Sequence, residues 1–120
     1  MQDKPRFVMC NCTGECPGFE KVDFWGLLNY IRNELDVAYA VIHPQLCVDD
    51  GERFFDDLLQ HDVTYIIGAC DPRMQKKMFR DSFDKNEFDF DRQVVPLDLR
   101  NMTTEEAMAK VKEAVEKLRQ

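Results

Sequence analysis

Apolar residues occur along this chain in two alternating patterns, as short continuous runs and as stripes at helical spacing. The runs cover residues 7–9, 37–42, 63–67 and 94–97. Short apolar runs bounded by turn residues and rich in β-branched or aromatic side chains are typical of strands. The run at 63–67 is almost wholly apolar, which favours a central strand buried on both faces. Pro96 places the last run at an edge of the sheet.

Helical stripes follow each run. The predicted helices begin after Asp23, at Asp49 or Asp50, at Asp71-Pro72, and after a capping box made by Thr103 and Glu106. The inward residues are expected to be Phe24, Leu27, Leu28, Ile31, Leu35, Phe54, Phe55, Leu58, Leu59, Met74, Met78, Phe79, Ala107, Val111, Ala114, Val115 and Leu118. Residues 84–92 are predicted to form a loop whose Phe88 and Phe90 tuck into the body; a partner-binding patch is the alternative.

The resulting order is β-α-β-α-β-α-β-α, which favours a parallel sheet with right-handed crossovers. We therefore predict one α/β domain over residues 1–120. Its expected form is a three-layer Rossmann-like fold, with an open, mostly parallel four-stranded sheet and helices on both faces. A chain of 120 residues that is 44% apolar can build one such core without help from disulfides.

The charge balance narrows the choice of partners. Sixteen basic against 23 acidic residues give a net charge of −7, so the chain repels phosphate backbones and anionic membranes. We expect no nucleic acid and no membrane partner. Apolar runs fall short of the roughly 20 residues that span a bilayer, and residues 1–5 carry no apolar export signal. These features predict a cytoplasmic protein.

Five cysteines carry the candidate chemistry: Cys10, Cys12, Cys16, Cys47 and Cys70. The odd number and the expected compartment argue against a disulfide framework. Buried apolar cysteines are the simplest alternative, although three within seven residues of one loop fit it poorly. Loops that follow parallel strands open on one edge of the sheet, and the cysteines fall in the first, second and third of these loops. The sequence therefore predicts a metal centre at that edge.

Four thiolates there could hold a 4Fe–4S cluster or a tetrahedral zinc ion. The chain has no C-x-x-C pair, which weakens a thioredoxin-type interpretation. Arg73, one turn into the third helix, could offset negative charge or could be an ordinary solvated side chain. His43 is an alternative ligand, although a half-buried polar role suits it better. Cys47 and Arg53 have the C-x5-R spacing of thiol phosphatases, but the acidic residues between them would repel phosphate.

Three segments together resemble the N-terminal domain of the long, flavin-binding polypeptide of heterodisulfide reductase and its relatives in electron-bifurcating complexes. Residues 7–12 resemble that family's strand ending in C-x-C, and residues 47–51 its Cys-x-Asp-x-Gly turn. Residues 66–73, followed by Phe79-Arg80, are similar to its Ala-Cys-x-Pro-Arg segment with a downstream Phe-Arg. The likeness covers residues 7–80, with the same order and spacing.

The resemblance implies a cysteine-bound 4Fe–4S cluster that serves as one station in an electron-transfer chain, with a 2Fe–2S cluster or zinc as alternatives. Carried over by position, Cys10, Cys12, Cys47 and Cys70 are the ligands. The expected partner is an electron-donor or electron-acceptor protein, such as a larger oxidoreductase. The chain alone need not catalyse a reaction; a zinc-binding interaction domain and a thiol-disulfide redox protein are the alternative functions.

This chain departs from the family pattern in two respects. Thr13-Gly14 stands where the family has two glycines, and Cys16 is additional, so either Cys12 or Cys16 could be the fourth ligand. The flavin-binding and ferredoxin-like parts of the long family members have no counterpart in these 120 residues. We therefore expect no flavin on this chain, and flavin bifurcation and disulfide reduction are not carried over.

Overall fold

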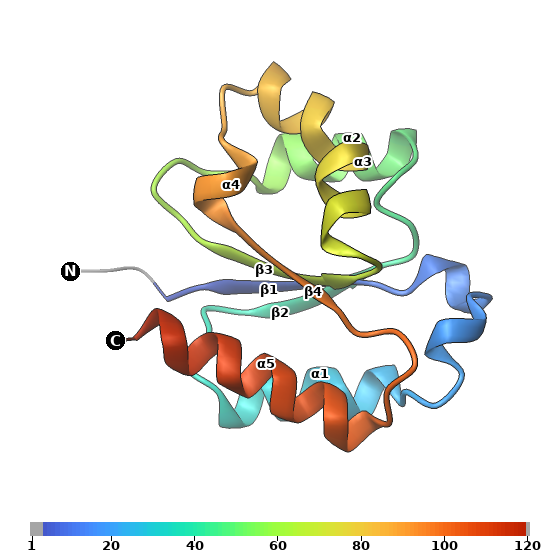
Figure 1. Cartoon of the computed structure of the whole chain (residues 1–120). Coiled ribbons are helices and arrows are strands. Elements are labelled where there is room, and N and C mark those ends of the chain that lie inside the picture. Colours follow the sequence, from blue (N-terminus) through green and yellow to red (C-terminus); the bar gives the residue numbers. More distant parts are fainter. Residues whose placement is uncertain (1–3, 120) are drawn as a thin grey trace.

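The computed structural model describes residues 4–119; Met1, Gln2 and Asp3, part of the N-terminal segment discussed above, lie outside that range. Its centre is a sheet made of β1 (Arg6–Cys10), β2 (Ala40–His43), β3 (Tyr65–Ala69) and β4 (Val94–Asp98). The strands lie in the order β2-β1-β3-β4, and every neighbouring pair is parallel (Figure 1). The predicted α/β fold class is confirmed, and β4 is an edge strand as Pro96 indicated.

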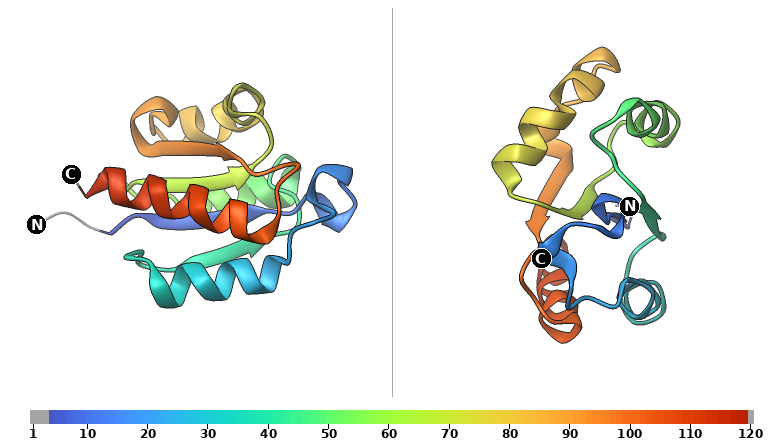
Figure 2. Two further views of the ribbon diagram at one scale, coloured as in Figure 1. Left: turned by 60° about the horizontal axis from the view of Figure 1, so that its bottom comes forward. Right: turned by 90° about the vertical axis from the view of Figure 1, so that its right-hand side faces the viewer.

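Helices cover both faces of the sheet, which makes three layers (Figures 1 and 2). α1 (Phe24–Glu34) and α5 (Thr104–Leu118) pack on one face, and α2 (Asp49–Leu58), α3 (Pro72–Lys85) and the short α4 (Phe90–Gln93) pack on the other. Two short 3₁₀ turns, η1 (Cys12–Gly14) and η2 (Pro17–Phe19), lie between β1 and α1.

Each face of the sheet forms a separate apolar core with the helices that cover it. Alternate residues of a strand point to opposite faces, so Phe7 and Met9 of β1 join the core under α1 and α5, whereas Val8 joins the core under α2 and α3. All three side chains are fully buried. Burying a large apolar side chain stabilises a fold by about 1.5–3 kcal/mol, so these two cores hold the sheet rigid beneath its loops.

The predicted helix starts are largely confirmed. Asp23 accepts from the Gly26 N–H at 3.1 Å, and Asp71 accepts from the Arg73 N–H at 2.8 Å with a proline at the first helical position. Thr103 and Glu106 form the reciprocal capping box. These caps satisfy N–H groups that a helix start leaves without partners.

The structure corrects several details. β2 begins at Ala40 rather than Val37, and the Ala38 N–H bonds the Pro5 carbonyl just before β1. Val48 takes the N-cap position of α2, and the two predicted caps lie in its first turn. Met74 is 48% exposed rather than inward, since it faces away from the sheet in the first turn of α3.

Residues 84–92 do not form a simple loop. α3 continues to Lys85 and α4 begins at Phe90. Phe90 is buried and stacks edge-on against Phe83 at 5.4 Å, and Phe88 packs against the same core. The predicted inward packing of both phenylalanines is confirmed; they are anchored by helical segments.

The strand order places a topological switch point between β1 and β3. β1 leads into α1 on one face, whereas its neighbour β3 leads into α3 on the other face. In open α/β sheets, ligands usually bind beyond the carboxyl ends of two strands whose loops diverge in this way; this position at the edge of the sheet, between the ends of β1 and β3, is called the crevice below. The right-hand panel of Figure 2 looks onto this edge. Within residues 4–119, none of the helices has the length and apolar character needed to cross a bilayer.

Candidate metal centre

Cys10 is the last residue of β1 and sits at the crevice. Its side chain is buried, and its Sγ accepts a hydrogen bond from the Leu46 N–H at 3.4 Å. The backbone amide of Cys12 also lowers the pKa of the Cys10 thiol, although burial raises that pKa more. Backbone donors aimed at sulfur stabilise a thiolate, so the loops after β1 and β2 both support Cys10.

Cys12 and Cys16 lie on an unusual loop. Cys12, Thr13 and Gly14 all have positive φ angles, of 53°, 58° and 79°. Non-glycine residues rarely adopt this conformation. The loop is fixed by a 2.6 Å hydrogen bond from the Thr13 N–H to the Pro44 carbonyl. As a result Cys12 is exposed, whereas Cys16 is partly buried and packs against the core under α1 and α5.

Cys47 is exposed on the loop between β2 and α2. The Gln45 side-chain amide reaches its Sγ at 3.6 Å. Gly51, in the first turn of α2, permits a close approach of this loop, since a Cβ at that position would collide with the Leu46 carbonyl. The loop therefore folds back tightly enough for Leu46 to contact Cys10.

His43 stabilises this loop through hydrogen bonds at both of its ring nitrogens. The Gln45 N–H donates to Nδ1 at 3.0 Å, so the ring proton is on Nε2, which donates to Asp50 Oδ2 at 2.7 Å. The ring is buried and lies 5.1 Å from the Phe54 ring, centroid to centroid. Both nitrogens are engaged, so the geometry favours the structural role of His43 over the alternative of ligation.

Cys70 directly follows β3 on the other side of the crevice and is partly buried. Its carbonyl accepts from the Gln75 amide at 2.9 Å, and the same amide nitrogen donates to the Leu97 carbonyl at 3.2 Å. Gln75 is fully buried. This one side chain therefore ties Cys70 to the end of β4.

Arg100, in the loop after β4, places a positive charge beside Cys70. Its Nε and Nη2 contact the Asp98 carboxylate at 3.0 and 2.8 Å. The stem of Arg100 packs on Gly18, where a Cβ would lie 2.9 Å from the arginine side chain. The Asn101 N–H also bonds the Gly18 carbonyl at 2.6 Å. Arg100 thus connects the cysteine loop after β1 with the Cys70 side of the crevice.

The ionisation of the thiols shows which of them the fold brings together. Burial raises the pKa of Cys10, and the Cys47 and Cys16 thiols raise it further. The pKa of Cys12 is raised by burial and by Cys10, Cys16 and Cys47. Burial also raises the pKa of Cys70, against a lowering effect of Arg100, and Cys10 adds to the increase. Cys10 is therefore the common neighbour of the other four.

All five cysteines are free thiols. They gather at the predicted edge, but they do not surround a single point: among residues 4–119, no group of three or more His, Cys, Asp or Glu side chains is close enough to hold one metal ion. Arg73, the cation suggested by the sequence, is exposed at the start of α3, and Arg100 is the cation that influences Cys70.

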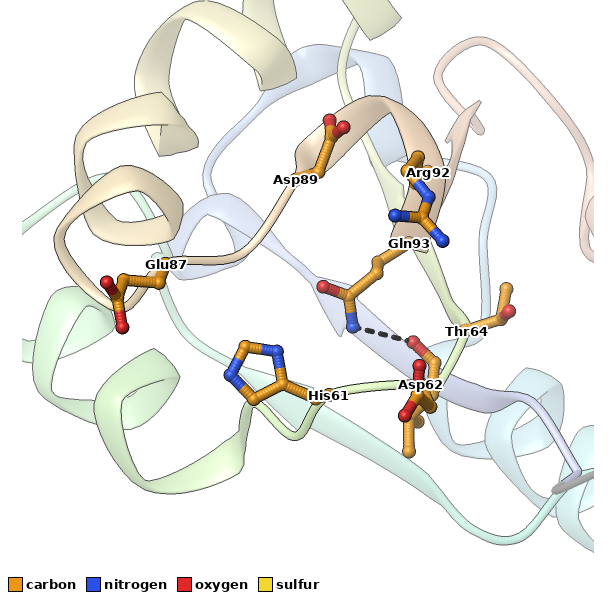
Figure 3. A pocket seen from close by; sticks show the side chains of 8 residues that line it. His61, Asp62, Thr64, Glu87, Asp89, Arg92 and Gln93 are labelled. Carbon is orange, nitrogen blue, oxygen red and sulfur yellow. Dashed lines mark hydrogen bonds between the residues drawn. The ribbon is translucent and has the colours of Figure 1, made fainter.

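A polar hollow of about 310 Å³ lies at the opposite edge of the sheet, before β3 and α4 (Figure 3). Gln93 crosses it and donates to the Val63 carbonyl at 3.0 Å. Its lining consists of His61, Asp62, Val63, Thr64, Glu87, Asp89, Arg92 and Gln93. No thiol lines this hollow, so the cysteine edge remains the candidate site.

Comparison with known proteins gives this chain no family. No protein-family model matches it, and no curated protein matches it significantly. The functional argument therefore rests on the geometry of the cysteine edge and on the resemblance of the three sequence segments.

Sequence reasoning located the thiols but missed Arg100 and the backbone donor at Leu46. A signal for Arg100 was present, because the loop after a fourth parallel strand must open on the same edge as the first three. The Leu46 contact had no comparable signal. It depends on how tightly the loop after β2 folds back, which Gly51 makes possible.

Proposed function

We propose that this protein binds an iron–sulfur cluster, of the 4Fe–4S type, and transfers electrons as a small carrier or as one component of an oxidoreductase complex. Cys10, Cys47 and Cys70 are the proposed ligands, with Cys12 as the fourth and Cys16 as its alternative. The observation that carries the proposal is the convergence of thiols from three separate loops on the crevice between β1 and β3.

The donor set suits such a cluster. Thiolate sulfur is the usual ligand of iron–sulfur centres, and a polynuclear cluster distributes its ligands over a wider cage than one ion does. That spread agrees with thiols that influence one another without meeting at a point. Cys12 suits the fourth position better than Cys16, because Cys12 is exposed and interacts with both Cys10 and Cys47, whereas Cys16 packs against the core.

The chain supplies the setting for one-electron transfer, which is the chemistry that the cluster provides when bound. The Leu46 N–H donates to Cys10, and hydrogen bonds to ligand sulfurs raise a reduction potential. Arg100 adds positive charge next to Cys70. Cys12 and Cys47 lie at the surface, so electrons have a short path to a docked partner. We propose a larger oxidoreductase as that partner, a cytoplasmic location, and no flavin on this chain.

The test is anaerobic purification followed by iron and acid-labile sulfide analysis. We expect about four of each per chain and visible absorption that bleaches on reduction. Cys10→Ser, Cys47→Ser and Cys70→Ser should abolish stable incorporation, and one of Cys12→Ser and Cys16→Ser should do so while the other does not. A folded protein that stays colourless and free of iron after reconstitution would contradict the proposal.

One observation favours a second function. Cys16 raises the pKa of the Cys12 thiol by its charge and by a side-chain hydrogen bond, so the two thiols are close enough to act together as a dithiol. A metal-free protein in which these two cysteines cycle between disulfide and dithiol would support a thiol redox protein. Tightly bound zinc with no labile sulfide would instead support a zinc-binding interaction domain.

A further inference from the structure

The most exposed large apolar side chains among the described residues all lie at helix starts on the cysteine edge. Among residues 4–119, the large apolar residues that are most exposed are Trp25 at 68%, Met74 at 48% and Val48 at 41%. Trp25 and Met74 lie in the first turns of α1 and α3, and Val48 is the N-cap of α2. These helix starts come from different parts of the chain and all follow the carboxyl ends of parallel strands, so they lie at one edge of the sheet, α1 on one face and α2 and α3 on the other (Figure 2).

Burial in the fold does not explain this arrangement. The two cores are closed without these three residues, which belong to neither. Exposed large apolar side chains that share one edge of a fold can make contact with another molecule at that edge. Tryptophan and methionine are also enriched in protein interfaces.

The same edge is acidic, which indicates the kind of partner. Half of the carboxylates there are occupied by caps or ion pairs, and the exposed residues Glu15, Glu20, Asp49, Glu52 and Glu105 form no ion pair within the described chain. Charged residues in these loops and first turns are Glu15, Glu20, Lys21, Asp23, Asp49, Asp50, Glu52, Arg53, Asp71, Arg73, Asp98, Arg100, Glu105 and Glu106. Carboxylates therefore outnumber cations around Trp25, Val48 and Met74.

We infer that the cysteine edge docks a basic protein whose contact face has an apolar centre, with Trp25, Val48 and Met74 as contacts and Glu15, Asp49 and Glu52 as steering charges. Complementary charge selects such a partner and speeds its encounter. A second copy of this chain is disfavoured as the occupant, because it would bring two acidic edges together. The inference deepens the proposed function by stating the charge and the contact chemistry of the electron-transfer partner. It rests on the proposed function only in taking electron transfer as the purpose of docking.

The test uses cytochrome c, a basic electron-transfer protein, as the probe, and an acidic flavodoxin as its counterpart. Binding to the purified protein is measured by calorimetry at low ionic strength and at about 1 M salt, where the screening length falls to about 3 Å. We expect micromolar to millimolar binding of cytochrome c that is lost in high salt, and no binding of flavodoxin.

Two matched variants localise the contact. Glu52→Lys should weaken binding about tenfold, whereas Glu34→Lys, an exposed charge at the far end of α1, should change it less than twofold. Trp25→Ala should also weaken binding about tenfold, the scale of an interface hot spot. Equal effects of Glu52→Lys and Glu34→Lys, unchanged affinity in Trp25→Ala, or binding of flavodoxin would overturn the inference.

The measurement separates this inference from the proposed function. Calorimetry does not require the cluster. If an iron-free protein shows the expected order of affinities, the docking surface is supported and the iron–sulfur proposal is contradicted. If an iron-loaded protein fails the variant test, the iron–sulfur proposal is supported and the docking surface is contradicted.

Discussion

Nε2 of His43 lies 2.7 Å from Oδ2 of Asp50, which connects the end of β2 to the first turn of α2 across the loop that carries Cys47. The imidazole is buried and its second nitrogen accepts the Gln45 N–H. His43 therefore positions the Cys47 loop, and its location beside the thiols follows from its pairing with Cys10 in the parallel ladder.

His43→Ala tests this positioning role. Losing a buried hydrogen-bonding side chain should lower the free energy of unfolding by about 1–3 kcal/mol. Iron content per folded chain should stay unchanged, because the imidazole is not a ligand. Urea denaturation gives the stability, and Asp57→Asn on the same helix is the control that should change neither quantity. Loss of iron from folded His43→Ala would show that iron binding depends on the ring, either as a ligand or through its support of the Cys47 loop.

The thiols should react at different rates in the metal-free protein. Cys10 is buried and its pKa is raised, so it should be alkylated last, whereas the exposed Cys47 should be modified early. A time course with iodoacetamide read by mass spectrometry checks this order. Iron loading should then slow the alkylation of all four ligand cysteines. Early modification of Cys10 would contradict the buried position at the end of β1.

The ionisation of the Cys10 thiol should make the stability of the folded protein depend on pH. The folded pKa of Cys10 lies above its ordinary value of 9.0 because burial favours the neutral thiol. The folded state therefore holds this proton more tightly than the unfolded state, so the associated stability is present below pH 9.0 and is lost as the pH rises through the folded pKa. Thermal unfolding of the metal-free protein between about pH 7 and pH 10.5 measures the loss, which Cys10→Ala should reduce.

Arg100→Gln tests the cation beside Cys70. Removing the charge should raise the pKa of the Cys70 thiol, since Arg100 lowers it in the native protein. The stability cost should be small, about 0.2–1 kcal/mol, because the Asp98 pair is partly exposed. The pH profile of Cys70 alkylation gives the pKa. Arg73→Gln is the matched control, and a larger shift in that variant would favour the cation suggested by the sequence.

Gly51→Ala should loosen the Cys47 loop. The added Cβ collides with the Leu46 carbonyl, so the loop must move and Leu46 must leave Cys10. We expect a loss of about 1–3 kcal/mol and faster alkylation of Cys10. Gly14→Ala is the comparison: its Cβ meets no atom within 4 Å but its φ is +79°, so its cost should stay near about 1 kcal/mol. Equal alkylation of Cys10 in both variants would contradict this account.

The order of strands and helices could be predicted from the sequence because periodicity, caps and proline positions all agree on it. Asp71-Pro72 and the capping box of Thr103 are local signals. Their hydrogen bonds join residues close in sequence, so they form at the predicted helix starts in the folded protein. Helical spacing alone places Met74 inward, but spacing cannot tell which face of a first turn meets the sheet. The start of β2 at Ala40 was also missed, because the apolar run from Val37 to Ile42 does not show where pairing with β1 begins.

The cysteine edge was predictable for a different reason. Parallel strands that share a sheet end on one side, so their order along the chain is enough to place Cys10, Cys47 and Cys70 at the same edge. How they meet was not predictable, because it depends on the left-handed turn at Cys12 and Thr13 and on the tight loop at Gly51. Those features decide which thiols influence Cys10.

The strand order also determines when the site can exist during synthesis. β1 lies between β2 and β3, so Cys10 acquires its neighbours only after a chain segment ending at Cys70 has emerged and paired. Such non-local pairing is slow compared with helix formation. The two apolar cores can close without any ligand, and the Cys12 and Cys47 thiols remain exposed afterwards. A cofactor that needs these loops together must therefore be inserted late, into a chain that has already folded.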